Sequence, residues 1–400
     1  MNARVDPHGL LRRVRRKVSH KSRGRILYLT PGVFDKGGIS RYCRYQISAL
    51  RDLLGDDSTT VLSLLSTDAH SFEIPFEVYM SSSGPNLRGK TLLSFAAAAC
   101  AFGDRPDIVW SAHAHLTPMA VALARLIRAE VVVNVYGAEV WTNVTRMRAA
   151  SIRAADFLIS DCHATLDHIL AERLHRREQT YVHWDCVDLT RFNPGDPGDV
   201  LVRYGVPSSP HRMTVLTLAR LAADEGHKGV DRLIEVIGHL PADAGVRLVV
   251  AGDGTGRQSL ESQAAATPNA AHIHFTGRVT EDDLPLIYRA CDVFAMVTHK
   301  GPGIGEGIPL TPLEAAACEK PIIVGNQDGS REAAVDGESG FILDPFDLDA
   351  LRERICQLAA DEAMRKSMGR RAKERITREH SYERFREHLG AFLRDTSLRE

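Results

Sequence analysis

The strongest constraint in this sequence is the alternation of short apolar segments with stretches of helical periodicity. Segments 131–135 and 248–251 consist almost entirely of apolar residues, as expected for strands covered on both faces of a parallel sheet. We expect strands at residues 26–30, 60–65, 77–80, 108–112, 131–135, 157–160 and 181–183, and a second series at 214–218, 247–251, 272–276, 293–297, 321–324 and 341–343. The pattern predicts two α/β units built on parallel sheets.

Helical segments fall between most of these strands and define the expected domains. We expect helices at residues 39–54, 92–102, 118–129, 230–240, 257–265, 282–290, 312–318 and 348–358. A turn-forming segment at 193–199 predicts the linker between an N-terminal Rossmann-like domain, residues 25–195, and a C-terminal one, residues 200–375. Parallel sheets bind ligands beyond the carboxyl ends of their strands, so the two sheets predict a ligand in a cleft between the domains.

The charged tail is expected to be helical. Its last part, residues 376–400, either packs on the second domain or crosses back to the first, and periodicity does not decide between them.

Charge and cysteine content limit the class of protein. The 50 Lys and Arg residues against 51 Asp and Glu leave a net charge of −1, so no overall field attracts nucleic acid, and we expect no nucleic-acid partner. The 7 cysteines include no C-x-x-C pair, which argues against a disulfide framework and a zinc knuckle, and we expect a cytoplasmic protein. No apolar run has the length that a bilayer-spanning helix needs.

The N-terminal segment, residues 1–24, is strongly basic. It contains eight Lys or Arg residues and one acid, Asp6, and it lacks the apolar core and cleavage site of a secretory signal. One interpretation is attachment to an anionic membrane surface, which would make the protein peripheral on the inner face of the membrane. The other is a tail without fixed structure, and the sequence leaves both open.

Several residues at expected strand ends have the chemistry to bind a phosphorylated ligand. Gly37 and Gly38 precede a helix, where backbone N–H groups and the helix dipole favour an anion, although a turn that needs glycine explains them equally well. Arg220 and Lys228 follow strand 214–218 and have the charge to hold a diphosphate. Solvated cations neutralised by nearby acids are the alternative.

A glycine-rich segment at 301–307 contains the most informative acid of the chain. Thr311, Pro312 and Glu314 fit the N-cap, N1 and N3 positions of the following helix, so a capping box explains Glu314 structurally. Glu306 has no such explanation. An acid in a glycine loop at a strand end is placed to touch a ligand, with a solvated loop residue as the alternative.

Two histidines, His113 and His115, stand where strand 108–112 ends. One of them is placed to reach the predicted cleft as an acid, a base or a hydrogen-bond donor, whereas a purely structural role is the more frequent one for a lone histidine. No third metal ligand lies near them in the sequence.

Two further motifs have structural interpretations. The segment Gly252-Asp-Gly254-Thr-Gly256-Arg257 lacks the last glycine of a dinucleotide fingerprint, which favours a tight turn. The pair Asp347 and Asp349 opens an expected helix, which favours a cap over a metal site.

Together these residues resemble the retaining GT-B glycosyltransferases of family GT4. Arg220 with Lys228 is similar to the diphosphate-holding pair of that family, and Glu306 and Glu314 match its E-x7-E signature. The likeness is denser in the second half of the chain, and the other matching segments lie at residues 252–254, 274–279, 292–294 and 321–332, with 37–38, 137–141, 187–188 and 191–192 in the remainder.

The resemblance implies two Rossmann-like domains and the transfer of a sugar from a nucleoside-diphosphate sugar to a glycan, lipid-linked or small-molecule acceptor, in cell-envelope polysaccharide synthesis. It implies retention of the anomeric configuration, with neither a metal nor a cofactor. The catalytic residues that it implies are Glu306, Arg220, Lys228 and His115. On the donor side it implies Gly38, Arg278, Val279, Gly307, Ile308, Pro309, Leu310 and Glu314, and on the acceptor or cleft side His113, Tyr136 and Glu139.

The sequence departs from the family pattern beside the expected donor pocket. Tyr136 replaces a frequent His, Ile308-Pro309 replaces Phe-Gly, residues 184–186 replace Pro-Asn-Gly, and Glu319 replaces Gly. The alternatives are a non-catalytic sugar-nucleotide-binding GT-B protein and a same-fold sugar-nucleotide epimerase. The charged site residues are all present, which favours an enzyme over a binding protein.

Overall fold

A computed structural model describes residues 25–34, 37–65, 74–80, 86–208, 212–301 and 303–398. The predicted basic segment 1–24 lies outside the described residues. The chain divides into two compact units, the first comprising Met1–Cys186 and Tyr382–Glu400, the second Val187–Ser381. The boundary after Cys186 precedes the predicted linker, so residues 193–199 belong to the second unit. The last helix returns to the first unit, one of the two possibilities that the sequence left open.

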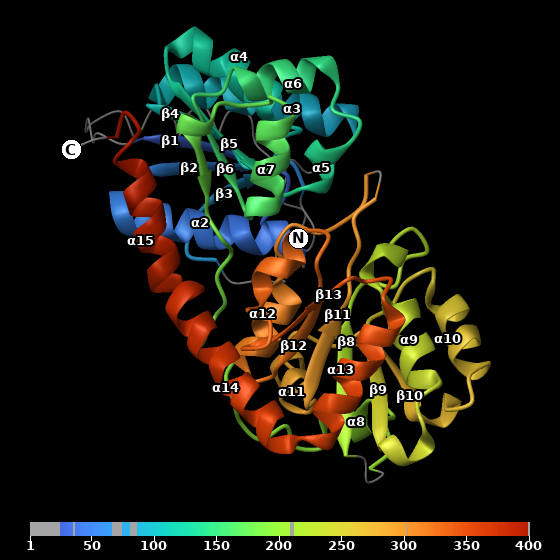
Figure 1. The fold of residues 1–400 in the computed structure, drawn as a ribbon. Coiled ribbons are helices and arrows are strands. Elements are labelled where there is room, and N and C mark those ends of the chain that lie inside the picture. The colour runs from blue at the N-terminus through green and yellow to red at the C-terminus, as the bar shows by residue number, and fades with distance from the viewer. Residues whose placement is uncertain are drawn as a thin grey trace, which may run out of the picture. The chain divides into compact units, whose positions relative to one another are not determined.

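The first unit contains one parallel sheet of seven strands in the order β3-β2-β1-β4-β5-β6-β7 (Figure 1). β1 is central and is buried along its whole length, because helices cover both of its faces. The strands are β1 (Ile26–Thr30), β2 (Thr59–Ser63), β3 (Val78–Met80), β4 (Ile108–Ser111), β5 (Glu130–Val135), β6 (Phe157–Ser160) and β7 (Thr180–Val182).

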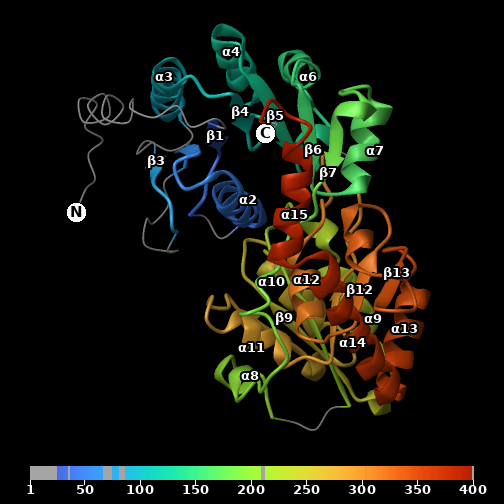
Figure 2. The same ribbon diagram turned by 90° about the vertical axis from the view of Figure 1, so that its left-hand side faces the viewer.

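Alternate residues of β1 enter two separate cores. Leu27 and Leu29 pack with α3 (Leu87–Asp104), α4 (Thr117–Ile127) and α6 (Arg146–Arg153), while Ile26 and Tyr28 pack with α2 (Gly38–Leu54) and α15 (Tyr382–Leu393). Figure 2 shows α2 and α15 side by side. The remaining helices of the unit are α5 (Ala138–Trp141), α7 (His163–Ala171) and the 3₁₀ turn η1 (Arg177–Gln179).

A buried hydrogen-bond network joins the first sheet to α2. The Tyr28 hydroxyl and the Asn134 amide both donate to Gln46 Oε1, each at 2.7 Å. Trp110 Nε1 donates to Asn134 Oδ1 at 3.0 Å, and the Asn134 amide also donates to the Tyr136 hydroxyl at 3.1 Å. Because buried polar groups are costly without partners, this network fixes the position of α2 on the sheet.

The second unit repeats the architecture with six parallel strands in the order β10-β9-β8-β11-β12-β13. They are β8 (Met213–Leu218), β9 (Val246–Ala251), β10 (Ile273–Gly277), β11 (Val293–Met296), β12 (Ile322–Gly325) and β13 (Gly340–Leu343). The helices are α8 (Val200–Arg203), α9 (Val230–Gly238), α10 (Arg257–Ala265), α11 (Leu284–Arg289), α12 (Leu310–Ala317), α13 (Leu348–Ala360) and α14 (Glu362–Glu379). The 3₁₀ turns are η2 (Gly226–Lys228), η3 (Ala242–Ala244), η4 (Ala270–His272) and η5 (Gly329–Ala333).

The predicted fold class of two Rossmann-like α/β units is confirmed. All 13 predicted strands are present, with bounds within two residues of the expected ones. Four short helices, α5 to α8, were not predicted, although α10, α11 and α12 of similar length were.

The interpretation of residues 252–257 as a tight turn is confirmed by the backbone. Gly252 follows β9 with φ of 128°, and a Cβ atom at that position would lie 1.9 Å from the carbonyl oxygen of Ala219. Only glycine fits, because other residues rarely adopt this conformation and no side chain has room.

We predict that Gly252→Ala destabilises the second unit by about 3 kcal/mol, because it adds both a strained φ and a backbone clash. Denaturant unfolding measures this loss. Gly226→Ala is the matched control, since its Cβ meets nothing within 4 Å and its φ is not in the left-handed region. Equal stabilities of the two variants would contradict the prediction.

Candidate functional site

Three candidate residues of the second unit follow the carboxyl ends of parallel strands. Arg220 follows β8, Arg278 follows β10, and Glu306 lies in the loop after β11. Strand ends of one parallel sheet share an edge, so residues from separate loops converge there. A binding site of this unit is therefore expected among the loops at this edge.

Glu306 is the centre of this cluster. Its Oε1 accepts hydrogen bonds from Lys228 Nζ at 2.6 Å and from His227 Nε2 at 3.1 Å. Because a carboxylate only accepts, the His227 ring carries its proton on Nε2 in this contact. The other ring nitrogen, Nδ1, is buried without a hydrogen-bond partner. The structure thus brings together two predicted residues, Glu306 and Lys228, and adds His227.

The electrostatics of the cluster keep Glu306 ionised. Burial by itself raises the pKa of Glu306, but the Lys228 charge and the hydrogen bonds from His227 and Lys228 outweigh burial and lower the pKa from 4.5 to about 2. A carboxylate of this kind is a permanent hydrogen-bond acceptor at neutral pH.

Asp328, which the sequence analysis did not single out, fixes the loop that presents Glu306. Asp328 Oδ2 accepts from the Glu306 backbone N–H at 2.9 Å, and the Gly329 N–H donates to the Glu306 carbonyl at 3.0 Å. Oδ1 accepts from the hydroxyls of Thr298 and Ser330 at 2.9 and 2.6 Å. Both backbone groups of Glu306 are therefore held by one buried turn, although its loop is rich in glycine.

The predicted cation pair shares one acid. The Arg220 guanidinium contacts Glu225, and Lys228 Nζ lies 3.7 Å from Glu225 Oε2. The Arg220 side chain is 74% exposed, whereas that of Lys228 is 17% exposed. The local acid that the sequence offered as an alternative partner is therefore present, and Arg220 retains most of its surface for a ligand.

The predicted capping box is wrong. Helix α12 begins at Leu310 after Pro309, so Thr311 is inside the helix and makes no cap bond. Glu314 is 2% exposed, and its carboxylate accepts a hydrogen bond from the Tyr288 hydroxyl at 2.8 Å. The extended backbone of Pro309 lets the helix start two residues earlier than the Thr-Pro signal indicates.

The remaining donor-side residues lie at the same strand ends. Arg278 is exposed directly after β10, with the half-buried Val279 beside it. Gly307 and Ile308 lead through Pro309 into the first turn of α12 at Leu310, and Pro309 has no N–H to offer. Contact of these residues with a ligand stays a prediction.

In the first unit, His113 and His115 lie after β4 with their ring centroids 4.7 Å apart. The His115 backbone N–H donates to His113 Nδ1 at 3.2 Å. Burial, followed by the Arg148 charge, lowers the pKa of His113 to about 4, and burial also lowers the pKa of His115. His113 is thus neutral near pH 7, while the more exposed His115 is the better placed of the two to meet a ligand.

Two other candidates of the first unit, Glu139 and Tyr136, form hydrogen bonds within the protein. Glu139 Oε1 accepts from the Tyr136 backbone N–H at 2.6 Å, and burial raises the pKa of Glu139. The Tyr136 hydroxyl belongs to the buried network that includes Asn134, and the whole side chain is buried, with its ring packed between those of Tyr42 and His113. Gly38 is the first residue of α2, after Gly37 at the N-cap. Acceptor and donor roles for these residues stay predictions.

The part of the chain that the structure describes contains no group of three or more His, Cys, Asp or Glu side chains placed to hold a metal ion. The interpretation of Asp347 as a helix cap is confirmed, since its side chain accepts from the Ala350 N–H at 2.9 Å. Asp349 forms an ion pair with Arg352 at 2.6 Å.

His227, Asp328 and Tyr288 are the members of the site that sequence reasoning missed. Asp328 was detectable in part, because Asp-Gly-Ser is a turn sequence directly after an expected strand. His227 and Tyr288 carried no local signal, since their partners are 79 and 26 residues away in the chain.

The second unit matches a known protein family. The sequence model described as "Glycosyl transferases group 1" matches residues 207–375, which include the Lys228–Glu306 cluster and Glu314. This unit belongs to the group 1 glycosyl transferases. The resemblance to family GT4 is thereby confirmed.

Curated relatives agree with this assignment. A "GDP-mannose-dependent alpha-(1-6)-phosphatidylinositol monomannoside mannosyltransferase" of Mycobacterium tuberculosis is 31% identical over 52% of this chain. The match spans 54% of that relative, so the chain spans about half the length of such relatives. A "GDP-mannose-dependent monoacylated alpha-(1-6)-phosphatidylinositol monomannoside mannosyltransferase" of Corynebacterium glutamicum is 26% identical over 89% of this chain and 94% of its own.

Solved structures share the fold of both units. HepE of Anabaena, crystallised with UDP and glucose, has a TM-score of 0.74 at 17% identity and covers 92% of this chain and 99% of its own. Sucrose-phosphate synthase of Thermosynechococcus elongatus has a TM-score of 0.74 at 18% identity, over 92% of this chain and 98% of its own. The GT-B fold is thereby confirmed.

We predict that Glu306→Gln lowers stability at pH 7 and that this difference disappears in acid. The pKa of Glu306 is lower in the folded than in the unfolded chain, so the stabilisation is complete above about pH 4.5 and is lost as the pH falls toward 2. Denaturant unfolding of both proteins across this pH range measures the difference.

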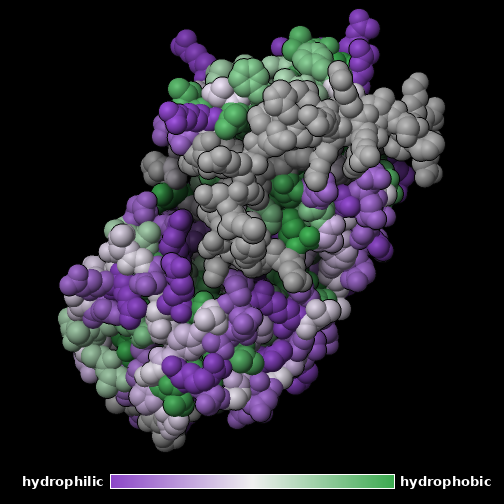
Figure 3. Space-filling view, turned by 180° about the vertical axis from the view of Figure 1, so that it is seen from behind, coloured by the Kyte–Doolittle hydropathy of each residue, from purple (hydrophilic) through white to green (hydrophobic). Residues whose placement is uncertain are grey.

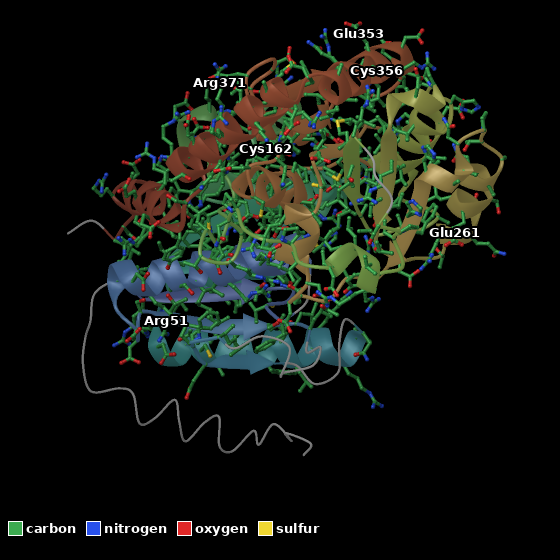
Figure 4. The ribbon with its side chains drawn as sticks, turned by 90° about the horizontal axis from the view of Figure 1, so that it is seen from below. Arg51, Cys162, Glu261, Glu353, Cys356 and Arg371 are labelled. Carbon is green, nitrogen blue, oxygen red and sulfur yellow. The ribbon has the colours of Figure 1, made fainter. Side chains whose placement is uncertain are left out.

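The control for this prediction is Glu353→Gln on α13. Figure 4 shows Glu353 at the periphery, and its side chain is 70% exposed. The control should change stability little at any pH. A Glu306→Gln difference that is independent of pH would contradict the assigned charge state.

Proposed function

We propose that this protein is a glycosyltransferase that moves a sugar from a nucleoside-diphosphate sugar to an acceptor. The observation that carries the proposal is the Glu306 carboxylate, held ionised by Lys228 and His227 on a loop that Asp328 fixes. A carboxylate fixed in this way can accept hydrogen bonds from sugar hydroxyls, and the adjacent cations can take up phosphate charge.

The proposed roles of the cations follow from the place where negative charge develops during sugar transfer. Cleavage of the bond to the sugar moves negative charge onto the departing nucleoside diphosphate, and preorganised cations stabilise that charge most strongly when it is fully developed. Without a ligand, Glu225 and Glu306 neutralise Arg220 and Lys228. A bound diphosphate replaces these acids as the partner of the cations, which leaves Glu306 available to the sugar.

The relatives indicate which donor to test first. Both mannosyltransferases named above are GDP-mannose-dependent by name, whereas HepE was crystallised with UDP and glucose. We therefore place GDP-mannose first and UDP-glucose second among the donors.

The finer features of the proposal come from the family resemblance. They are retention of the anomeric configuration, independence of a metal, and a glycan or lipid-linked acceptor in cell-envelope synthesis. His115 is proposed to serve the transfer from the first unit, and the reaction is placed in the cytoplasm.

The first experiment is thermal stabilisation by GDP, UDP, ADP, TDP and their sugars, each with and without EDTA. A ligand present at 100 times its Kd adds about 2.7 kcal/mol. We expect one nucleotide to stand out, with the same shift in EDTA. Incubation with the matching donor should then release free nucleoside diphosphate when an acceptor is present.

Three outcomes would contradict parts of the proposal. No response to any nucleotide would remove the donor site. Binding without release of nucleoside diphosphate would favour a non-catalytic binding protein. A changed sugar that is still attached to its nucleotide would identify an epimerase.

We predict that Glu314→Gln weakens nucleotide binding about tenfold or more, because the proposed role of Glu314 is to accept from the ribose hydroxyls. Tyr288→Phe is the matched control, since it removes the hydrogen bond that Glu314 accepts inside the protein and keeps the carboxylate. Isothermal titration with the selected nucleotide compares them. Equal affinity of wild type and Glu314→Gln would leave Glu314 with a structural role only.

A further inference from the structure

The helices on one side of the first sheet carry an unusual set of exposed apolar residues. Among the described residues, ten large hydrophobic side chains are exposed, and six of them lie on α3, α4 and α6. Isolated exposed apolar residues are normal, but a concentration on adjacent elements marks an interaction site. We call this set the outer helical surface; it consists of Leu87, Leu92, Phe95, Phe102, Leu126 and Met147.

Helix α3 is apolar on both faces. Leu93, Ala97 and Cys100 point into the core, yet Phe95 and Phe102 on the opposite face are 72% and 56% exposed. The exposed side of the helix also carries polar residues, namely Arg88, Lys90, Thr91 and Ser94, so it combines large apolar and basic side chains. Among the described residues, protein covers only the face of α3 that carries Leu93, Ala97 and Cys100.

The neighbouring helices extend this surface. α3 packs against α4, and α4 packs against α6. Leu126 of α4 and Met147 of α6 are each 68% exposed. In Figure 3 green, hydrophobic atoms gather along the top of the molecule, where α4 lies in Figure 1, and purple, hydrophilic side chains project beside them.

The charge of the same helices is strongly positive. Between them α3, α4 and α6 contain a single acid, Asp104, against six cations. Arg153 donates to a backbone carbonyl, which is neutral, so its charge remains at the surface, whereas Arg148 is directed toward Glu139 and the His113–His115 pair. The chain as a whole has a net charge of −1, so this excess is local. The six cations are Arg88, Lys90, Arg125, Arg146, Arg148 and Arg153.

The combination of exposed apolar side chains and positive charge indicates which kind of partner this surface binds. A second copy would bring two positive surfaces together, and the basic segment 1–24 would be repelled in the same way. Nucleic acid would match the charge but not the exposed phenylalanines and leucines. An anionic lipid surface matches both, because its headgroups attract Arg and Lys while its acyl boundary accepts apolar side chains.

We infer that the outer helical surface lies on an anionic lipid membrane, with Phe95 and Phe102 inserted at the acyl boundary and the cations of α3, α4 and α6 on the headgroups. The helices lie on the membrane and do not cross it, since no described helix is both long and apolar enough to span a bilayer. The inference is independent of the donor chemistry, because no residue of the second unit takes part.

The test is sedimentation of the full chain with vesicles. Vesicles of phosphatidylcholine mixed with phosphatidylglycerol are compared with vesicles of phosphatidylcholine alone. Wild type should bind the anionic vesicles, and added salt should weaken this binding. The double variant Phe95→Ser, Phe102→Ser should partition about tenfold or more weakly, because it loses the apolar insertion.

The matched control is Val202→Ser, which removes an exposed apolar side chain (52%) from α8 of the second unit and should bind like wild type. Thermal unfolding verifies that all variants are folded; the substituted side chains are exposed, so folding should be preserved. Absence of wild-type binding would overturn the inference. So would undiminished binding of the double variant, which would assign the membrane contact to residues elsewhere, such as 1–24.

A second measurement separates lipid from a protein partner. Analytical ultracentrifugation without lipid should show the same association state for wild type and the double variant. An oligomer that the double substitution disperses would overturn the inference in favour of contact between copies of this chain.

Discussion

The burial of both faces of each parallel sheet is the constraint on which the rest of the molecule depends. A strand such as β1, buried along its whole length, has no surface on which to place a functional group. Polar and charged residues therefore collect in the loops at the strand ends, and parallel strands bring these loops to one edge. The cluster of Arg220, Lys228 and Glu306, joined through Glu225, follows from this topology, although its members lie up to 86 residues apart in the chain.

At that edge, the buried turn at Asp328 and Gly329 fixes the backbone of Glu306 in its glycine-rich loop. The segment before Glu306 is rich in glycine, which gives the backbone freedom to approach a ligand. That freedom would leave the carboxylate without a fixed position if Asp328 did not bind the Glu306 N–H. Lys228 and His227 then set the charge and direction of the side chain. Positioning residues from two other loops, the one after β8 and the one after β12, thus act on one acid.

Much of this was predictable from the sequence, and the failures have identifiable causes. The strands could be located because fully buried segments are apolar and are interrupted by glycine and proline. Lys228 and Glu306 could be singled out as charges without a structural explanation. The capping role predicted for Glu314 was wrong because α12 begins at Leu310, two residues before the Thr-Pro signal indicates, and because the Glu314 carboxylate accepts a tertiary hydrogen bond from Tyr288, which no local pattern encodes. His227 was missed for the second of these reasons.

The return of α15 to the first unit has a consequence for biosynthesis. Phe392 packs on Trp110 and Tyr181, and the Phe385 carbonyl accepts from His183 Nε2 at 2.9 Å, so the last residues of the chain complete the core of the domain that is translated first. Synthesis must therefore pass residue 393 before this core can close. Until then the apolar residues of α2 that pack with α15, such as Ile47 and Leu50, remain exposed to chaperones, and a chain truncated near residue 380 keeps them exposed.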